Sequence, residues 1–382
     1  MVPVFFVTAS HMLLEMSRTT GYSIGNLSLI FTFFNAGLIG GQLTSVFYSR
    51  KFKKVNIILT GYIIIIPCLI LLIFVESLYL YYTLYCLIGY AAGVIWLQAT
   101  KYMLENNIKN KDRLFTIFLN FYPIGHITAP FIASYLINNG INWRYSYGVM
   151  IFFVVIIFIL YLVLKRGRRT EIYDEEEEKL QFKKIFFNRR LNIIFILGCI
   201  PLTLYAISET VISTWASPFL QSARSFDIQT AGLTISIFWI AVIIGRIIVS
   251  FLAGRFKTNH IILCLSIIAI IPMILFISVK STYAAIIVIA SAGLGYSGII
   301  TLLISAASTV YEKGRGVLAS IVFAAANTGI SITPFITRFV SQFNMNLSIA
   351  VAPISMTLLA VFIIGKNIYE NTSGKIEIKI KK

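Results

Sequence analysis

The sequence has little charge for its length. Only 12% of its 382 residues are Asp, Glu, Lys or Arg, whereas a soluble domain carries about 25%. Acidic residues are the scarcer kind, 15 against 32 basic ones, so the formal net charge is +17. In a soluble protein this excess would suggest a nucleic-acid partner. Long apolar runs such as residues 55–75 and 261–279 indicate a membrane protein instead, so we expect no nucleic-acid partner.

The motifs of enzymes and of ATP-driven pumps are missing. The sequence contains no P-loop, zinc-ligand spacing or nucleophile–base motif, so we expect no catalytic residue, no metal and no cofactor. The run Gly293-Leu-Gly295 is not a dinucleotide site, because no strand precedes it. Four cysteines lie inside apolar runs, which indicates buried thiols and not a disulfide framework: Cys68, Cys86, Cys199 and Cys264.

We expect no signal peptide. The N-terminus has neither a charged leader nor a small-residue cleavage site. Its first apolar run, residues 1–16, is shorter than the roughly 20 residues of a full span. We expect the chain to start inside a short first helix. Finding Met1 as the first residue of the natural protein by N-terminal sequencing would contradict this.

Continuous apolar runs dominate the chain and predict an all-α membrane protein. Only helices and closed barrels satisfy their backbone hydrogen bonds in lipid, and barrel strands would alternate in segments of about 10 residues. The runs predict twelve transmembrane helices. Their expected ranges are 1–16, 27–48, 55–75, 79–103, 114–137, 146–164, 191–221, 230–252, 261–279, 281–308, 317–339 and 345–365.

One long polar stretch divides these spans into two groups of six. Residues 165–190 contain basic clusters around the acidic run 174–178, which predicts a solvated linker or, less simply, a regulatory site. We therefore expect an N-terminal six-helix bundle at 1–164, a linker at 165–190, a C-terminal six-helix bundle at 191–366 and a basic tail at 367–382.

Basic residues are unevenly divided between the two sides of this arrangement. Twenty-five lie in the linker, the tail and the connections on the same side, and five lie on the other side. Cytoplasmic loops are enriched in Lys and Arg, so both termini are predicted to be cytoplasmic. We expect a monomer in the cytoplasmic membrane, the inner membrane of a bacterial cell. The five exceptions are Arg18, Arg144, Arg224, Lys280 and Arg338.

The two halves of the chain resemble each other at an offset near 204. Both Gly125–Phe131 and Gly329–Phe335 read G-x4-P-F, with prolines at Pro130 and Pro334. The segment 40–50 also parallels 245–255, since each has a glycine, a serine five residues on and an arginine ten residues on. Repeated six-helix halves with a site between them are a known transporter plan, and Gly and Pro permit bending and close helix approach.

The loop after the eighth span resembles one of the major facilitator superfamily. Ser250-Phe-Leu-Ala-Gly-Arg255-Phe-Lys is similar to the G-x-L-A-D-R-F-G loop of that superfamily, and Ser45–Lys54 is similar to a second copy. Ser49 and Gly254 stand where the acidic residue of the motif would be. The resemblance implies a fold of two pseudo-symmetric six-helix bundles, with Arg50, Arg246, Arg255, Pro130 and Pro334 in gating or packing roles.

Finer features resemble the fucose–proton symporter-like branch and, within it, the TsgA-like proteins. Phe31-Thr-Phe-Phe-Asn35-Ala-Gly37 is similar to their second-span motif, and Tyr205-Ala-Ile-Ser-Glu209 to the Y-x-x-x-E of the symporters. Leu97-Gln98-Ala-Thr stands where the symporters have L-E-T-A. The resemblance implies secondary transport of a small solute, with proton coupling as an open alternative because an amide at Gln98 cannot exchange a proton.

Intramembrane polar residues are the candidate substrate or coupling sites. A charged residue there costs roughly 2.5–3.5 kcal/mol, so it indicates function; Glu209 is the strongest case, with pairing to Arg246 as the alternative. A mid-span histidine titrates near neutral pH, although a satisfied core group is equally common. The candidates are Glu209, Gln98, His126, Asn35, Asn120, Asn327, Trp215 and Tyr296.

His11 and Glu15 lie four residues apart near the end of the first span. They could line the mouth of the protein as a pair, or simply form an interfacial helix end. Taken together, the sequence predicts import of a small polar solute such as a sugar. Two alternatives stay open: an exporter of lipophilic or cationic compounds, and a sensor built on a transporter scaffold.

Overall fold

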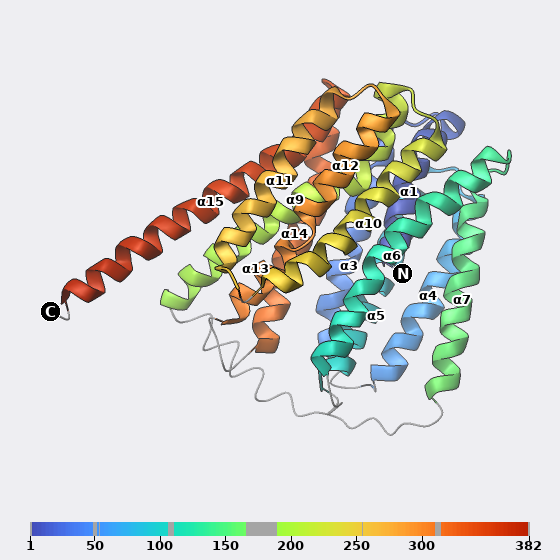
Figure 1. Cartoon of the computed structure of the whole chain (residues 1–382). Coiled ribbons are helices and arrows are strands. Elements are labelled where there is room, and N and C mark those ends of the chain that lie inside the picture. The colour runs from blue at the N-terminus through green and yellow to red at the C-terminus, as the bar shows by residue number, and fades with distance from the viewer. Residues whose placement is uncertain are drawn as a thin grey trace. The chain divides into compact units, whose positions relative to one another are not determined.

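The computed structural model describes residues 2–48, 52, 54–105, 111–165, 189–253, 255–309 and 315–380. Within these ranges every named element is an α-helix. The one sheet-like contact recorded there is an isolated bridge between Ala253 and Phe256. Figure 1 shows the helices in chain order, from blue at the N-terminus to red at the C-terminus.

The helices follow the predicted spans closely. In the first half they are α1 (Val2–Thr20), α2 (Ile24–Leu27), α3 (Leu29–Tyr48), α4 (Lys54–Phe74), α5 (Leu78–Glu105), α6 (Lys111–Asn138) and α7 (Tyr145–Lys165). In the second half they are α9 (Arg189–Arg224), α10 (Ile228–Leu252), α11 (Thr258–Ser278), α12 (Thr282–Tyr296), α13 (Ile299–Thr309), α14 (Arg315–Ser341) and α15 (Met345–Ile380).

Two spans are broken, and several helices run past their predicted ends; the last, α15, continues from the predicted end at residue 365 to Ile380, so most of the predicted basic tail is helical. The second span is the pair α2–α3, and the tenth is the pair α12–α13. The first helix continues past residue 16 to Thr20, and its 19 residues correspond to about 28 Å at 1.5 Å per residue. The described part of the first span is therefore nearly as long as the hydrocarbon layer is thick, about 30 Å. The predicted linker lies almost wholly outside the described residues.

Local sequence explains several helix ends. Ser23 precedes α2, and its hydroxyl accepts a hydrogen bond from the Asn26 N–H at 3.2 Å, as an N-cap does. The Asp227 carboxylate accepts one from the Thr230 N–H at 2.9 Å at the start of α10. Gly140 follows α6 with φ of 72°, a left-handed conformation that glycine adopts without steric cost.

The helices form two compact units that cut across chain order. Unit 1 comprises Met1–Glu177, Ser213–Ser236 and Ser331–Ser348. Unit 2 comprises Glu178–Ile212, Ile237–Ile330 and Ile349–Lys382. The helices α9, α10, α14 and α15 therefore each contribute residues to both units.

In unit 1, glycines bring α3 and α5 into backbone contact. A Cβ atom added to Gly37 or Gly41 would lie 1.9 or 2.0 Å from a carbonyl oxygen of α5. The same holds in reverse for Gly89 and Gly93, at 1.9 and 2.1 Å from carbonyl oxygens of α3. Both helices thus carry a small-xxx-small pair, which allows close packing where lipid supplies no hydrophobic driving force.

Unit 2 uses the same device around α12. A Cβ on Gly293 would lie 2.4 Å from the Phe238 carbonyl oxygen of α10, and one on Gly295 would lie 2.4 Å from the Ala269 nitrogen of α11. The ring of Phe238 meets that of Tyr296 edge-on, with centroids 5.5 Å apart. This packing fixes the Tyr296 end of α12 in the interior of unit 2.

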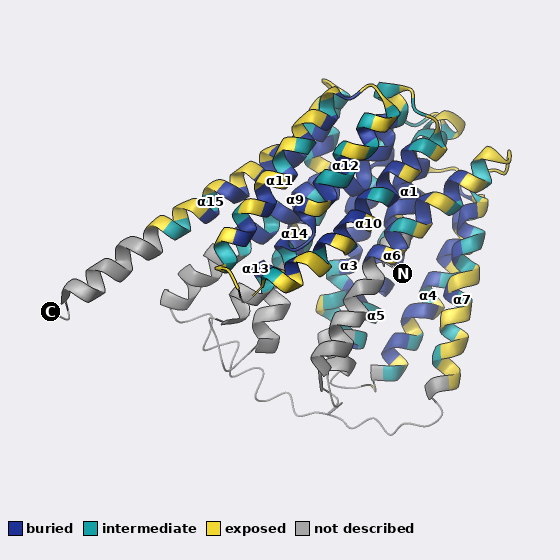
Figure 2. Ribbon diagram, viewed as in Figure 1, coloured by how far each residue is buried: buried dark blue, intermediate teal, exposed yellow. Residues whose placement is uncertain are grey.

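The outward faces of the helices are apolar, as expected for surfaces in contact with lipid. Eight helical segments in the described residues are long and apolar enough to cross a membrane. In α7 only 22% of that segment is buried, so most of its Phe, Ile and Val side chains face outward; Figure 2 shows α7 with exposed residues along its length. Exposed apolar surface on this scale marks membrane contact.

The other four predicted spans correspond to α1, α6, α9 and α14. Each carries a polar or charged residue in its central part: His11, His126, Glu209 and Asn327 respectively. Since such residues are costly in lipid, they are expected to face the protein interior.

Candidate functional site

The Glu209 carboxylate lies in the middle of α9 and is half-buried. Tyr205 lies one turn earlier on the same face and donates its hydroxyl to Glu209 Oε1 at 3.2 Å. The structure gives this carboxylate no further hydrogen bond from the described residues. Since a carboxylate can accept about four hydrogen bonds, most of its accepting capacity is open to a ligand.

Tyr296 of α12 contacts both Tyr205 and Ser208 of α9. The Tyr205 hydroxyl also lies 3.1 Å from the Tyr296 carbonyl oxygen, so its single proton is shared between this carbonyl and Glu209. The centroids of the two rings are 5.9 Å apart. Ser208 donates its hydroxyl to the Ala352 carbonyl oxygen at 2.7 Å and is also hydrogen-bonded to the Tyr296 hydroxyl. Because a serine has one hydroxyl proton, Tyr296 must be the donor to Ser208.

Arg246 supplies a positive charge that acts on this cluster. Its Nε donates to the Ser297 carbonyl oxygen at 3.2 Å, and the guanidinium is close enough to act on the charge of Glu209. The neighbouring Gly245 packs so tightly on Ser297 that a Cβ would lie 2.5 Å from its side chain. Among the described residues the one ion pair within 4.0 Å joins Arg18 to Glu15, so Arg246 does not neutralise Glu209 by direct contact.

This arrangement can bind a hydroxylated solute or hold a proton. A carboxylate held by one tyrosine offers strong, charge-assisted acceptors to a hydroxyl or amine. The surrounding Tyr, Ser and backbone groups are mutually satisfied, so they position the carboxylate without competing for a ligand. All of these groups belong to unit 2.

Two predicted amide sites are engaged within unit 1. The Asn35 side-chain nitrogen donates to the Phe31 carbonyl oxygen of its own helix at 2.7 Å. Gln98 is fully buried and donates to Ser45 of α3, at 3.0 Å to the carbonyl oxygen and 3.1 Å to the hydroxyl. Its Oε1 has no hydrogen-bond partner among the described residues. Gln98 thus bridges α5 to α3.

For the remaining polar candidates, the structure gives the helix and, for all but Asn120, the burial of the side chain but not its contacts. His126 of α6 is 1% exposed and belongs to unit 1, whereas Asn327 of α14 is half-buried and belongs to unit 2. Asn120 lies in α6, but its side chain is outside the described part of the chain. These three residues lie on α6 and α14, in the central part of two predicted spans.

The two aromatic candidates are both covered by protein. Trp215 of α9 is 1% exposed, and no described residue forms a hydrogen bond with its indole nitrogen. Tyr296 is fully buried, with its ring against Tyr205 and Phe238. Stacking of either ring on a solute would therefore require the covering groups to move.

The predicted packing residues follow the internal repeat. Pro130 and Pro334 are both buried, and the residues after them, Phe131 and Phe335, are 60% and 54% exposed. Arg255 is exposed after α10, and Arg50 lies outside the described residues. The matching burial in the two halves is the three-dimensional counterpart of the G-x4-P-F repeat.

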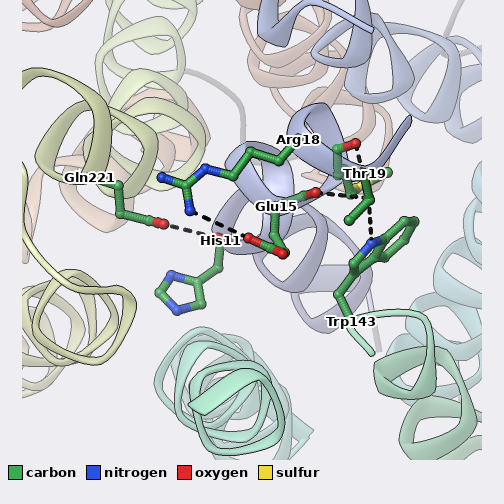
Figure 3. A network of polar contacts seen from close by, with 7 residues as sticks. His11, Glu15, Arg18, Thr19, Trp143 and Gln221 are labelled. Carbon is green, nitrogen blue, oxygen red and sulfur yellow. Dashed lines mark hydrogen bonds and ion pairs between the residues drawn. The ribbon is translucent and has the colours of Figure 1, made fainter. Parts of the chain in front are cut away.

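Sequence reasoning missed the partners of His11. Glu15 pairs with Arg18 at 3.6 Å, and the His11 ring instead contacts two serines, Ser217 of α9 and Ser134 of α6. Figure 3 shows the imidazole pointing away from the Glu15–Arg18 pair. The pairing of His11 with Glu15 at the mouth is therefore not formed. No sequence signal linked residue 11 to serines more than 120 positions away.

A cavity of about 150 Å³ lies beside Ser134, between α6 and α10 of unit 1. Its walls are apolar or uncharged, with amides at its rim. The lining residues are Phe131, Ser134, Tyr135, Asn138, Asn139, Gln229 and Leu233. With no charged group in the lining, this cavity is a poor match to an ion and differs in character from the Glu209 cluster.

Known proteins of similar sequence are found along most of the chain. A TsgA homologue of Buchnera aphidicola subsp. Baizongia pistaciae is 24% identical over 340 residues, which cover 88% of this chain and 84% of that protein. A TsgA homologue of Yersinia enterocolitica serotype O:8 is 22% identical over 343 residues, covering 89% and 85%.

Solved structures share the fold. The nucleoside transporter NupG superposes with a TM-score of 0.74 at 14% identity, covering 95% of this chain and 94% of that one. A D-xylose–proton symporter gives 0.73 at 14% identity, with 94% of each chain covered. The fold is thus the predicted one, twelve helices in two six-helix halves. The sequence pattern described as Major Facilitator Superfamily matches residues 4–334 and also 202–372, and the chain therefore belongs to that superfamily of membrane transporters.

Proposed function

We propose that this secondary transporter carries a small polar solute, a sugar or a related hydroxylated metabolite, and that Glu209 binds it. The observation that carries the proposal is the half-buried Glu209 carboxylate, which accepts a hydrogen bond from Tyr205 and forms no ion pair with any described residue. A carboxylate in a membrane span is costly, and a hydroxylated ligand would satisfy its open acceptors.

The names of structural neighbours agree with this class of solute. One is described as a nucleoside transporter and another as a D-xylose–proton symporter. Nucleosides and xylose are both neutral and rich in hydroxyl groups, which hydrogen-bond well to carboxylate and tyrosine oxygens. The likeness supports the solute class only through these names, since sequence identity is 14%.

We further propose that Glu209 carries the proton if transport is proton-coupled. A coupling group must gain and lose a proton during the cycle, and a carboxylate in a low-dielectric site can do so. Gln98 cannot take this part, because an amide does not exchange a proton near neutral pH, and its side chain is bonded to Ser45.

The proposed orientation has both termini in the cytoplasm and the chain in the cytoplasmic membrane. It rests on the 25 basic residues assigned to one side against five on the other. In this orientation the sequence halves 1–164 and 191–366 are the two bundles that rock about the solute, and 165–190 is the cytoplasmic linker between them.

Solute uptake into proteoliposomes tests the proposal. Wild type should take up radiolabelled sugars or nucleosides, and Glu209→Gln should lose most of this uptake, whereas Glu76→Gln, at an exposed connection, should not. Faster uptake when the outside is made acidic would support proton coupling. Extrusion of lipophilic cations without sugar uptake would favour the exporter, and no flux of either kind by folded protein would favour the sensor.

A further inference from the structure

We infer that His11 is the centre of a latch that closes one end of the transport path, and that this end opens only when its hydrogen bonds break. The latch consists of His11, Ser134, Ser217, Gln221 and the backbone of Ile228. The inference does not depend on which solute is carried, because it concerns the contacts that hold one end shut.

The latch joins four helices at one point in unit 1. His11 of α1 is 1% exposed. Its Nδ1 lies 2.7 Å from the Ser217 hydroxyl of α9, and its Nε2 lies 2.7 Å from the Ser134 hydroxyl of α6. Ser134 in turn reaches the Ile228 carbonyl oxygen at the start of α10. Two helices of the first sequence half are thus tied to two of the second half.

The neighbouring groups determine which atom donates each proton. Gln221 donates its amide to Ser217 at 2.9 Å, and Ser134 donates its hydroxyl to the Ile228 carbonyl at 3.2 Å. Since each serine has one proton and His can both donate and accept, Ser134 accepts from the His11 Nε2–H. Ser217 donates to Nδ1. A single neutral tautomer of His11 therefore completes the chain from Gln221 to Ile228.

The fit around the imidazole is close. A Cβ on Gly232 of α10 would lie 2.8 Å from His11 Cε1 and 2.8 Å from the Ser134 hydroxyl oxygen. Glycine at 232 is therefore what lets α10 approach the ring. Any buried histidine needs two hydrogen-bond partners. Here the partners lie on two other helices, α9 and α6, and a third helix, α10, approaches the ring at Gly232.

Further bonds of the same neutral kind run beside the latch. Ser10 donates to the Thr214 carbonyl oxygen of α9 at 2.6 Å, and Ser236 of α10 donates to the Ile127 carbonyl oxygen of α6 at 3.0 Å. Neutral hydrogen bonds contribute little net free energy each, so a set of them can hold a closed state and still be broken in every cycle. Glu15 and Arg18 satisfy each other nearby and stay outside the set.

A cysteine reporter behind the latch tests this directly. Thr8 lies on α1 one turn from His11, on the same face and farther from the Gly21 end, and is 3% exposed. The reporter Thr8→Cys is built in full-length protein that keeps Cys68 and has Cys86, Cys199 and Cys264 replaced by serine. Labelling by a membrane-impermeant maleimide is then followed in intact cells and in inside-out vesicles, without any solute.

We expect His11→Ala to raise the rate of Thr8→Cys labelling about tenfold, a factor within reach of two neutral hydrogen bonds, from one side of the membrane only. Ser217→Ala should raise it less, and Ser222→Ala, whose hydroxyl bonds only its own turn, should not raise it. The buried Cys68 of α4 should stay unlabelled throughout.

Three results would overturn the latch. They are unchanged Thr8→Cys labelling in folded His11→Ala, equal increases from both sides, and labelling of Cys68 together with the reporter, which would indicate general loosening. If His11→Ala does not fold, Ser217→Ala and Ser134→Ala carry the same test, because each removes one hydroxyl from the same chain. Uptake assays are not involved, so failure here leaves the proposed solute untouched.

Discussion

At the residue scale, two clusters of polar side chains carry the functional account. One surrounds Glu209 in unit 2 and the other surrounds His11 in unit 1. A polar group buried without a partner costs about 1–3 kcal/mol, which is why nearly every atom in these clusters is paired. The Glu209 carboxylate is the exception, since it keeps open acceptors on a half-buried side chain.

Ser208→Ala is predicted to destabilise the protein by about 1–3 kcal/mol. It removes the hydroxyl that donates to the Ala352 carbonyl and accepts from Tyr296, so each partner loses one buried hydrogen bond. Thermal or denaturant unfolding in detergent measures the change. Ser250→Ala is the matched control, because its hydroxyl is exposed and bonds only to its own turn. Equal stability of the two variants would show that the Ser208 bonds are not structural.

The sequence predicted some of these residues and not their neighbours. Tyr205 and Glu209 stand four apart on one helix, a spacing that places them on one face. Ser208 lies between them in the chain, but its partners Tyr296 and Ala352 come from α12 and α15, and no local pattern encodes such contacts. His11 was paired with Glu15 because the two are also four residues apart, but its hydrogen-bond partners, Ser217 and Ser134, lie on α9 and α6.

At the element scale, apolar run length was enough to predict the helices. Each predicted span corresponds to a helix or a broken pair in the described residues. The helix interruptions at Ser28 and Ser297 were not predicted, because hydropathy reports how favourably a segment enters lipid and contains no information on backbone geometry. Helix α1 was predicted four residues short because its end, Ser17–Thr20, is polar, although it remains helical.

Gly41→Ala is predicted to destabilise the α3–α5 contact by about 1–3 kcal/mol, the usual cost of overpacking. Its new Cβ would lie 2.0 Å from the Tyr90 carbonyl oxygen, a backbone atom that cannot rotate away. The control is Gly365→Ala in α15, where nothing lies within 4 Å and a helix interior should gain roughly 0.5–1 kcal/mol from the change. The free energy of unfolding in detergent is measured for both variants. An undiminished stability of Gly41→Ala would mean that α3 and α5 can move apart without cost.

At the scale of the whole molecule, the internal repeat predicts the two six-helix halves and the charge pattern predicts the orientation in the membrane. The repeat at an offset near 204 predicted two related six-helix halves, and the superfamily membership and shared fold confirm this. The compact units could not be predicted, because four second-half helices divide their residues between them, and this division depends on tertiary contacts that sequence symmetry does not specify.

The orientation is predicted by the basic residues and can be measured with fusions. Alkaline phosphatase inserted after Gly140, in the connection between α6 and α7, should be active because this connection is predicted to face outward. A fluorescent protein fused after Lys382 should fluoresce, since it folds in the cytoplasm. Activity and fluorescence in the opposite pattern would invert the topology and reassign the end that the His11 latch closes.

The central claim is that Glu209 binds a hydroxylated solute, and ligand-dependent stability tests it most directly. Wild type, Glu209→Gln and the exposed control Glu76→Gln are heated in detergent with sugars, nucleosides and lipophilic cations. A ligand at about 100 times its Kd should stabilise by roughly 2.7 kcal/mol. We predict that a sugar or nucleoside stabilises wild type and Glu76→Gln but not Glu209→Gln. Equal stabilisation of Glu209→Gln, or stabilisation by lipophilic cations alone, would contradict the claim.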